Sequence, residues 1–345
     1  MSSSFEKHDE KSENVTNSTS GIVSDNTMET TQIEQINIDG VVNANMLHAH
    51  LAMLAQFNNL EQQDSEIDQR FLLRSEKRYL LWLGLLNNGS FKDAEEVPIP
   101  SIDVCLIWHA HLLSPFRYYE DMRRLHDPLS KEYNFPLAKL HETWSQTKGD
   151  HIDERSKQFW EENTKQPWVL DPNDTSNFEL VCPWCSTTLM MAASEDCNWA
   201  KVAEFIKLRV KELKSQRLFI NVRKGTIRNV INSYSGIISP FSIELVSAVI
   251  RQREFTHKMV DNAWINNQTV QAQATIRYHK FLLLQKDTGK LLVPTLDIDL
   301  CWHTHMLFAS LYRNFTKNHM NRIINHDDTL TKSTLSNGFA ETSSA

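Results

Sequence analysis

A twenty-residue segment occurs twice in this chain, 194 positions apart and without a gap. It spans residues 100–119 and returns at residues 294–313, with eight identical positions, among them both histidines of a Trp-His-x-His sequence. Several other positions exchange similar residues, such as Ser for Thr and Val for Ile. One local structure is therefore used twice, and we predict an internal duplication.

The repeat also extends upstream of this segment. Arg78-Tyr79 precedes the first copy, and Arg277-Tyr278 precedes the second with a connection that is five residues shorter. Apolar residues at helical spacing surround both dipeptides. Each repeated unit is thus expected to be a helix, a loop and a second helix.

Composition favours an all-α fold. The 345 residues are 41% hydrophobic, enough for a large core, and they include only 9 glycines and 10 prolines, which disfavours a sheet-rich protein. We expect at most a small β element, near the turn Cys182-Pro183-Trp184-Cys185. Helices are predicted over about residues 47–60, 67–86, 101–114, 115–125, 136–148, 153–165, 199–216, 240–265 and 269–285 and over the second motif copy.

Two local signals place the ends of the first motif helices. Ser101 can cap the first helix, which should stop before Pro115, and Pro115 suits the first position of the next helix. The domain organisation follows from composition: residues 1–40 and 327–345 are polar and are predicted to be disordered. Residues 41–326 should form one helical domain with two related halves, whose motif copies lie at 98–119 and 292–313.

Charge and cysteine content limit the expected binding partners and the expected cellular compartment. A net charge of −7 gives no strong nucleic-acid signal. The sequence contains no apolar run long enough for a membrane span, so we expect no membrane association. Five cysteines without a secretory signal indicate a reducing compartment, and we expect the protein in the cytoplasm, the nucleus or both.

The motif residues could hold a divalent metal, because Asp and His are common ligands. Histidines two apart on a helix point about 160° from each other, so one copy cannot close around an ion by itself. A shared site would need the two motif helices to face each other. The candidate ligands for such a site are His109, His111, Asp103, His303, His305 and Asp297.

The alternative for the motif is purely structural. Apolar residues surround the first motif helix, which indicates burial, so Trp108 and Trp302 would fill the core and the histidines would be satisfied internally. The copies differ four residues before the first histidine, at Cys105 and Asp299. Asp299 should form an orienting carboxylate–imidazole pair with His303, and a nucleophilic Cys105 is disfavoured on an apolar helix.

A second constellation is the Cys-Pro-Trp-Cys turn. Cys182 and Cys185 have the spacing of half a zinc knuckle, and Cys197 could add a third ligand. A reduced structural turn and a redox pair are the other interpretations. No fourth ligand is evident from the sequence.

These features together resemble the glycine-rich-domain-containing-protein family of fungi and plants. The resemblance rests on both Trp-His-x-His segments, the Cys-Pro-x-Cys turn and the stretch Lys224 to Ile227, and it covers about residues 45–325. It implies no agreed biochemical activity, and RNA binding by appended segments of plant relatives does not carry over. Names of some fungal relatives point to a 2-oxoglutarate-dependent dioxygenase. The facial triad of such enzymes is normally carried by a β-barrel, which argues against that activity here.

Two functions from different classes are compatible with the sequence. The first is a non-catalytic scaffold or interaction module that binds a protein partner. The second is a metal-dependent, hydrolase-like enzyme with a His/Asp site shared between the two Trp-His-x-His helices. A divalent metal is the cofactor that the second function implies, and the sequence leaves open whether the chain is an enzyme.

Overall fold

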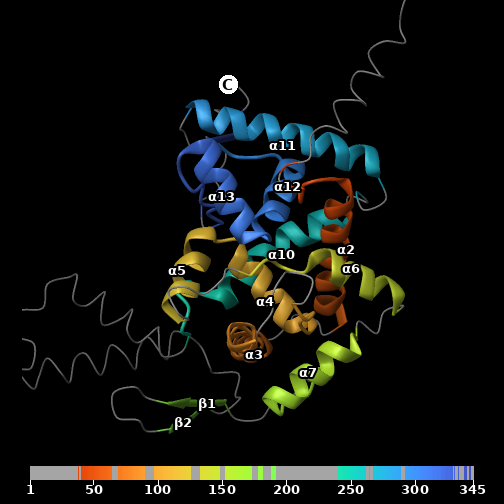
Figure 1. Ribbon diagram of the computed structural model, residues 1–345, viewed down its shortest axis with the longest axis vertical. Helices are drawn as coiled ribbons and strands as arrows, with labels where there is room; N and C mark the ends of the chain where they lie inside the picture. The colour runs from red at the N-terminus through yellow and green to blue at the C-terminus, as the bar shows by residue number, and fades with distance from the viewer. Residues whose placement is uncertain are drawn as a thin grey trace, which may run out of the picture.

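The computed structural model describes most of the helical body. It covers residues 38, 40–63, 69–89, 97–125, 133–147, 152–172, 178–181, 188–191, 239–261, 264, 267–288, 292–328, 330, 333, 338, 339 and 342. The helices in these residues are α2 (Ala44–Gln63), α3 (Gln69–Asn88), α4 (Ile102–Leu112), α5 (Pro115–Leu125), α6 (Leu137–Gln146), α7 (Glu154–Thr164), α10 (Leu245–Asp261), α11 (Gln268–Thr288), α12 (Leu296–Met306) and α13 (Ala309–Met320) (Figure 1). The all-α prediction is confirmed.

The predicted small β element is also present. Strands β1 (Phe178–Val181) and β2 (Thr188–Met191) pair antiparallel, with Phe178 opposite Met191. They flank the Cys-Pro-Trp-Cys turn, whose own residues lie outside the described part of the chain. No helix in the described residues is long and apolar enough to cross a membrane.

The first motif copy folds into two consecutive helices. Helix α4 ends before Pro115, and Pro115 is the first residue of α5, where a missing N–H costs no helical hydrogen bond. Ser101 occupies the N-cap position with extended backbone angles, but its side chain makes no cap hydrogen bond. Its hydroxyl instead accepts a hydrogen bond from Arg78, so the predicted capping role of this side chain is wrong.

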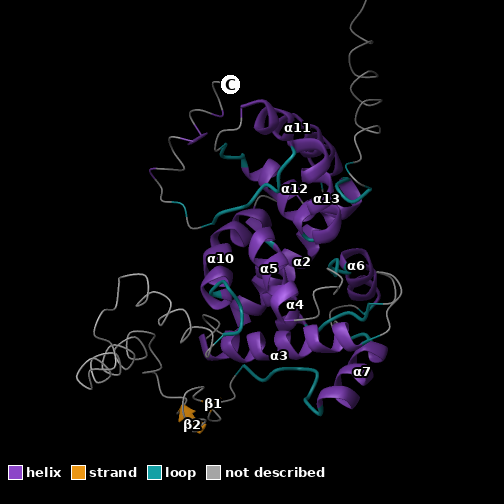
Figure 2. Cartoon of the chain, turned by 60° about the vertical axis from the view of Figure 1, so that its left-hand side comes forward, coloured by secondary structure: helices purple, strands orange, loops and turns teal. Residues whose placement is uncertain are grey.

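The duplication is visible as two helical hairpins. Helix α3 packs against α4, and α11 packs against α12 in the same sequence order. Between these hairpins lie α2, which contacts α10, α6, α11 and α12, and α10, which contacts α2, α3 and α4. Figures 1 and 2 show α11, α12 and α13 at one end of the molecule and α3 and α7 at the other.

The apolar side chains form one connected core. Trp108 is fully buried against Phe135, with ring centroids 5.1 Å apart, and Trp302 is also buried. The backbone N–H of Phe135 donates to the carbonyl of Leu307, which joins the first half of the chain to the second motif copy. Both motif helices are therefore buried inside one body.

Several predictions fall partly outside the described residues. These are the arm at residues 1–40, of which only 38 and 40 are described, and the helix at 199–216. Within the predicted C-terminal tail, Asp328 forms an ion pair with Arg251 at 3.1 Å, and the hydroxyl of Thr342 accepts a hydrogen bond from the N–H of Val293 at 2.9 Å.

Candidate metal centre

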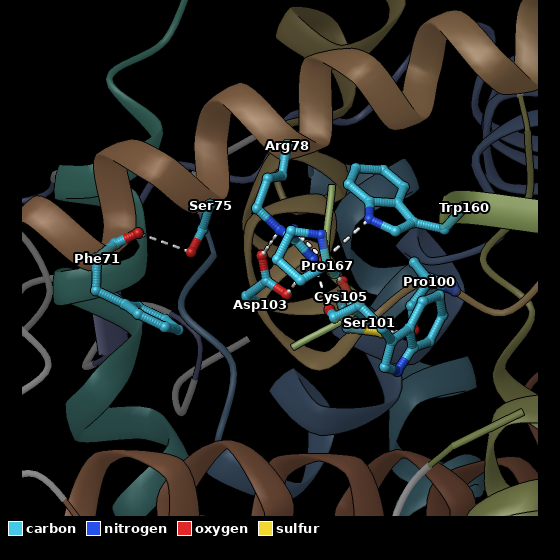
Figure 3. Close-up of polar contacts among 10 residues, drawn as sticks. Phe71, Ser75, Arg78, Pro100, Ser101, Asp103, Cys105, Trp160 and Pro167 are labelled. Carbon is cyan, nitrogen blue, oxygen red and sulfur yellow. Dashed lines mark hydrogen bonds and ion pairs between the residues drawn. The ribbon is translucent and has the colours of Figure 1, made fainter. Parts of the chain in front are cut away.

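An arginine–aspartate pair anchors each motif helix to the helix before it. Arg78 on α3 donates to Asp103 on α4 at 2.7 Å, and both side chains are almost completely buried (Figure 3). The same guanidinium also donates to the carbonyl oxygens of Pro167 and Trp168. Because Asp103 is committed to this buried pair, its role is to hold the hairpin together.

The second copy repeats this pair with an exposed arginine and a buried aspartate. Arg277 on α11 donates to Asp297 on α12, and the arginine side chain is 44% exposed. The parallel between Arg78-Tyr79 and Arg277-Tyr278 thus has a structural basis. Asp297, like Asp103, faces an arginine of its own hairpin.

The second histidine of each motif binds the tyrosine that follows this arginine. The hydroxyl of Tyr79 lies 2.9 Å from Nδ1 of His111, and that of Tyr278 lies 3.0 Å from Nδ1 of His305. Nε2 of His111 further approaches Asp121 at 3.2 Å. Burial lowers the pKa of His111, against the opposing effect of Asp121. These histidines therefore lie in structural hydrogen bonds within each half.

The first histidine of the first motif pairs with a histidine from α2. Nε2 of His50 lies 3.1 Å from Nε2 of His109, and Nδ1 of His50 lies 2.8 Å from the hydroxyl of Thr304 on α12. Thr304 donates its proton to the carbonyl of Leu300. Its oxygen must then accept from Nδ1–H of His50, and a neutral His50 accepts from Nε2–H of His109. His50 thereby links the two motif helices.

Burial keeps this histidine pair neutral. It lowers the pKa of His109 to about 3 and that of His50 well below its usual range, with His109 adding a smaller effect on His50. A neutral imidazole has one donor and one acceptor nitrogen, as the hydrogen-bond chain requires.

The first histidine of the second motif lies in a different group, formed with Asp299 and His326. Nε2 of His303 is 3.1 Å from Nε2 of His326 and 3.4 Å from Oδ1 of Asp299. The third distance, from Nε2 of His326 to Oδ1 of Asp299, is 3.7 Å. Three potential ligand atoms thus converge on one point.

Each of these side chains is positioned by the surrounding fold. Asp299 lies in the first turn of α12, one turn before His303, so both project from the same helix face. The two groups of the predicted Asp299–His303 pair are therefore adjacent, with 3.4 Å between Nε2 and Oδ1, but no hydrogen bond joins them. His326 follows α13, whose C-cap residue Asn321 has the left-handed conformation that turns the chain back. Tyr312 donates to the carbonyl of Ile324 and fixes this returning segment.

The orientation of His326 suits a metal ligand. Its Nδ1 lies 3.1 Å from the carbonyl oxygen of Leu113, so Nδ1 must carry the proton and Nε2 presents a lone pair. Metal-binding histidines typically donate their other ring N–H to a carbonyl in this way. The indole of Trp302 contacts the same ring edge-on, with centroids 5.2 Å apart.

Burial also affects the protonation of His303 and Asp299. Burial, and secondarily His326, lowers the pKa of His303 well below its usual range. Burial raises the pKa of Asp299 to about 6, although His326 opposes this effect. Without a metal, Nε2–H of His303 donates to the lone pair on Nε2 of His326. A divalent ion would replace this proton and would balance the charge of the half-buried Asp299 carboxylate.

The equivalent positions of the first copy do not converge. Cys105 replaces Asp299, and its Sγ donates to the carbonyl of Pro100 at 3.5 Å. Burial raises the pKa of the Cys105 thiol well above its usual range, which opposes a nucleophilic role. Across the described residues, the Asp299–His303–His326 group is the one that brings three such ligand atoms together.

The group opens onto a cavity of about 280 Å³. Its wall includes Asp299, His303 and His326, together with the side chains of Phe255 and Trp302. Phe255 lies against the ring of His303, with centroids 4.4 Å apart. The three candidate ligand side chains therefore border a cavity, although Oδ1 of Asp299 itself is shielded from solvent.

The structure does not bring the six predicted ligands to one point. The aspartates face arginines, the second histidines face tyrosines, and His109 faces His50, so that His303 alone joins the group described above. Cys182, Cys185 and Cys197 lie outside the described residues. Sequence reasoning missed His326, which belongs to no motif and lies 23 residues from its partner His303.

Sequence comparison identifies the family. The sequence model of the glycine-rich domain-containing protein-like family matches residues 7–121 and again 198–314, more than half of the chain. The chain belongs to this family. The two matched segments contain the two motif copies, in agreement with the paired hairpins of the fold, and the resemblance noted from the motifs is confirmed.

Two Arabidopsis thaliana members of this glycine-rich domain-containing protein family are similar over a shorter stretch. Glycine-rich domain-containing protein 2 is 40% identical and Glycine-rich domain-containing protein 1 is 35% identical, each over 91 residues. The stretch is 25% of this chain and 11% of each relative, so this chain covers only about a tenth of either protein. No solved structure shows significant similarity to the chain.

Proposed function

We propose that this protein binds a divalent transition metal through Asp299, His303 and His326. The observation that supports this most directly is the set of three distances between the ligand atoms, 3.1, 3.4 and 3.7 Å. Zinc bonds to His and Asp of about 2.0–2.1 Å place tetrahedral ligand atoms about 3.4 Å apart. The three atoms could thus hold an ion with little rearrangement.

The site is proposed to be of the catalytic type. Catalytic zinc sites use three protein ligands and leave a further position for water or substrate, whereas structural sites are closed by four. The cavity beside the three side chains supports an open position. A bound ion would act there as a Lewis acid, which is the chemistry that a metal-dependent hydrolase needs. In this proposal the site belongs to the second half and is not shared between α4 and α12.

A non-catalytic scaffold is the second function, and it is supported by a different observation. His50 joins His109 to Thr304, so one buried histidine ties both motif helices into a single core. Such a core would hold an outer surface rigidly for a protein partner. In this proposal the motif histidines serve stability alone.

Metal analysis distinguishes the two functions. The protein, purified without a histidine tag and dialysed against zinc or cobalt, should retain about one equivalent of metal. Asp299→Asn removes the one charged ligand, so it should reduce the metal affinity by more than about 100-fold. Loss of a residue that only supports a ligand typically costs about 10- to 100-fold. Cys105→Ser, at the equivalent position of the first copy, is the matched control and should leave affinity unchanged.

The contradicting results are equally specific. If the unsubstituted protein retains neither zinc nor cobalt after dialysis, the proposed metal site is wrong and the scaffold function remains. Equal loss of affinity in Asp299→Asn and Cys105→Ser would show that the metal binds elsewhere or depends on the fold alone.

A further inference from the structure

The cavity beside the candidate ligands combines an apolar wall with a particular charge balance. Its apolar side chains are Phe255, Leu292, Val293, Pro294, Trp302 and Leu330. Two of them adjoin the ligand histidines directly, since Phe255 lies against His303 and Trp302 lies against His326. A molecule in the cavity therefore meets apolar surface next to both ligand histidines.

The charge at the metal position follows from the ligands. Two neutral histidines and the Asp299 carboxylate around a divalent ion leave one net positive charge. One anionic donor atom from a ligand would neutralise it, and the low-dielectric wall would strengthen that attraction. The first requirement on a ligand is thus a single negative group at one end.

The remaining charged groups disfavour a second negative group. The described residues that line the cavity include no lysine or arginine, but they do include Asp327 and Asp328. Arg251 is nearby, but it pairs with Asp328 at 3.1 Å, and Gln252 donates to the other oxygen of the same carboxylate at 3.4 Å. A dicarboxylate would place its second charge near Asp327 and Asp328, and no lysine or arginine is among the described lining residues to receive it.

The volume limits the size of the ligand. Taking about 30 Å³ for each water-sized group, 280 Å³ holds about nine non-hydrogen atoms. This is near the lower end of the range of small-molecule sites.

We propose that the metal-loaded site binds a small monocarboxylate with an apolar chain of about five or six carbons, which coordinates the ion through its carboxylate. The acid products of ester and amide hydrolysis belong to this chemical class. The inference rests on the proposed metal site and goes beyond it by naming the ligand.

Cobalt-substituted protein provides the test, because the visible bands of Co²⁺ respond to a change of ligand. Hexanoate should shift these bands, with a dissociation constant at least tenfold below that of acetate. Each fully buried methylene contributes roughly fourfold in affinity, and partial burial lowers this factor. Succinate, with two carboxylates, should bind at least tenfold more weakly than hexanoate.

A pair of substitutions at the rim tests the location. Val293 is half-buried, and its backbone N–H is held by Thr342. Val293→Asp adds a negative charge to the apolar wall and should weaken hexanoate binding at least tenfold while the cobalt bands stay intact. Val293→Ala is the matched control and should weaken hexanoate binding by less than about fivefold, as loss of two methyl groups at a partly open wall implies.

The outcomes separate this inference from the metal site itself. Absence of cobalt bands overturns the proposed metal site. Cobalt bands that do not respond to hexanoate, or that respond to acetate or succinate at the same concentrations as to hexanoate, overturn the monocarboxylate pocket and leave the metal site standing. Equal effects of Val293→Asp and Val293→Ala would place the binding outside this cavity.

Discussion

Replacing His109 with glutamine should reduce the pH dependence of stability by a predictable amount. His109 is 2% exposed, and burial lowers its pKa to about 3. In the unfolded chain its pKa is about 6.5. Between these two values the unfolded state binds the proton and the folded state does not, so stability falls as the pH falls below about 6.5.

The magnitude follows from this difference. Each pH unit between the two pKa values changes the free energy of unfolding by about 1.4 kcal/mol. Going from pH 7 to pH 5, His109 alone therefore removes about 2 kcal/mol of stability. Glutamine cannot take up this proton. Between pH 7 and pH 5, the free energy of unfolding of the His109→Gln protein should therefore fall by about 2 kcal/mol less than that of the parent protein. This difference does not depend on how stable the variant is at pH 7.

Other buried groups titrate in the same range, which is why the comparison is made between two proteins. Burial lowers the pKa of His50, and it raises the pKa of Asp299 to about 6 and that of Glu76 to about 7. The raised carboxyl pKa values make the folded state bind protons first, so Asp299 and Glu76 oppose the histidine effect on acidification. The contributions of Asp299 and Glu76 cancel to first order when the variant is compared with its parent. The pKa of His50 remains lowered in the variant because burial is the larger cause of its shift and His109 the smaller one.

The assay is urea denaturation followed by tryptophan fluorescence at pH 7, 6 and 5, in the presence of a chelator so that metal release does not contribute. His257→Gln, which replaces an exposed histidine of α10, is the control for the substitution itself. If His109→Gln retains the pH dependence of the parent within about 0.5 kcal/mol, His109 is not held neutral in the core and the inferred His50–His109 hydrogen bond is incorrect.

Two further predictions compare equivalent positions of the two copies. Arg78→Met should destabilise the protein by about 3–5 kcal/mol because it leaves Asp103 buried without its partner. Arg277→Met should cost less than about 1 kcal/mol, because that arginine is exposed and Asp297 also accepts a hydrogen bond from Thr295. Equal losses in chemical denaturation would contradict this assignment. Trp108→Ala and Trp302→Ala should each cost about 3–5 kcal/mol as buried aromatic residues, and a loss below about 1 kcal/mol in the same assay would exclude them from the core.

The helical hairpins could be predicted because their signals are local. The repeat, the proline at position 115 and apolar spacing define α4 and α5 without knowledge of distant contacts. The Asp299–His303 pair was also within reach, since residues four apart share a helix face.

The rest of the site depends on contacts between distant parts of the chain. His326 joins His303 because a left-handed Asn321 and the hydroxyl of Tyr312 return the chain over α12. His50 reaches Thr304 across 254 residues of sequence. The sequence makes Asp103 a reasonable candidate ligand, because it does not show that the buried guanidinium of Arg78 lies beside it. In each case the partner is fixed by tertiary packing, which residue spacing does not report.

The most direct test of the metal site is anomalous diffraction at the zinc absorption edge, from crystals of tag-free protein grown with one equivalent of zinc. We predict one strong peak about 2.0–2.2 Å from Nε2 of His303, Nε2 of His326 and Oδ1 of Asp299. Zinc signal only at other positions, with these three side chains in direct contact with one another, would contradict the account.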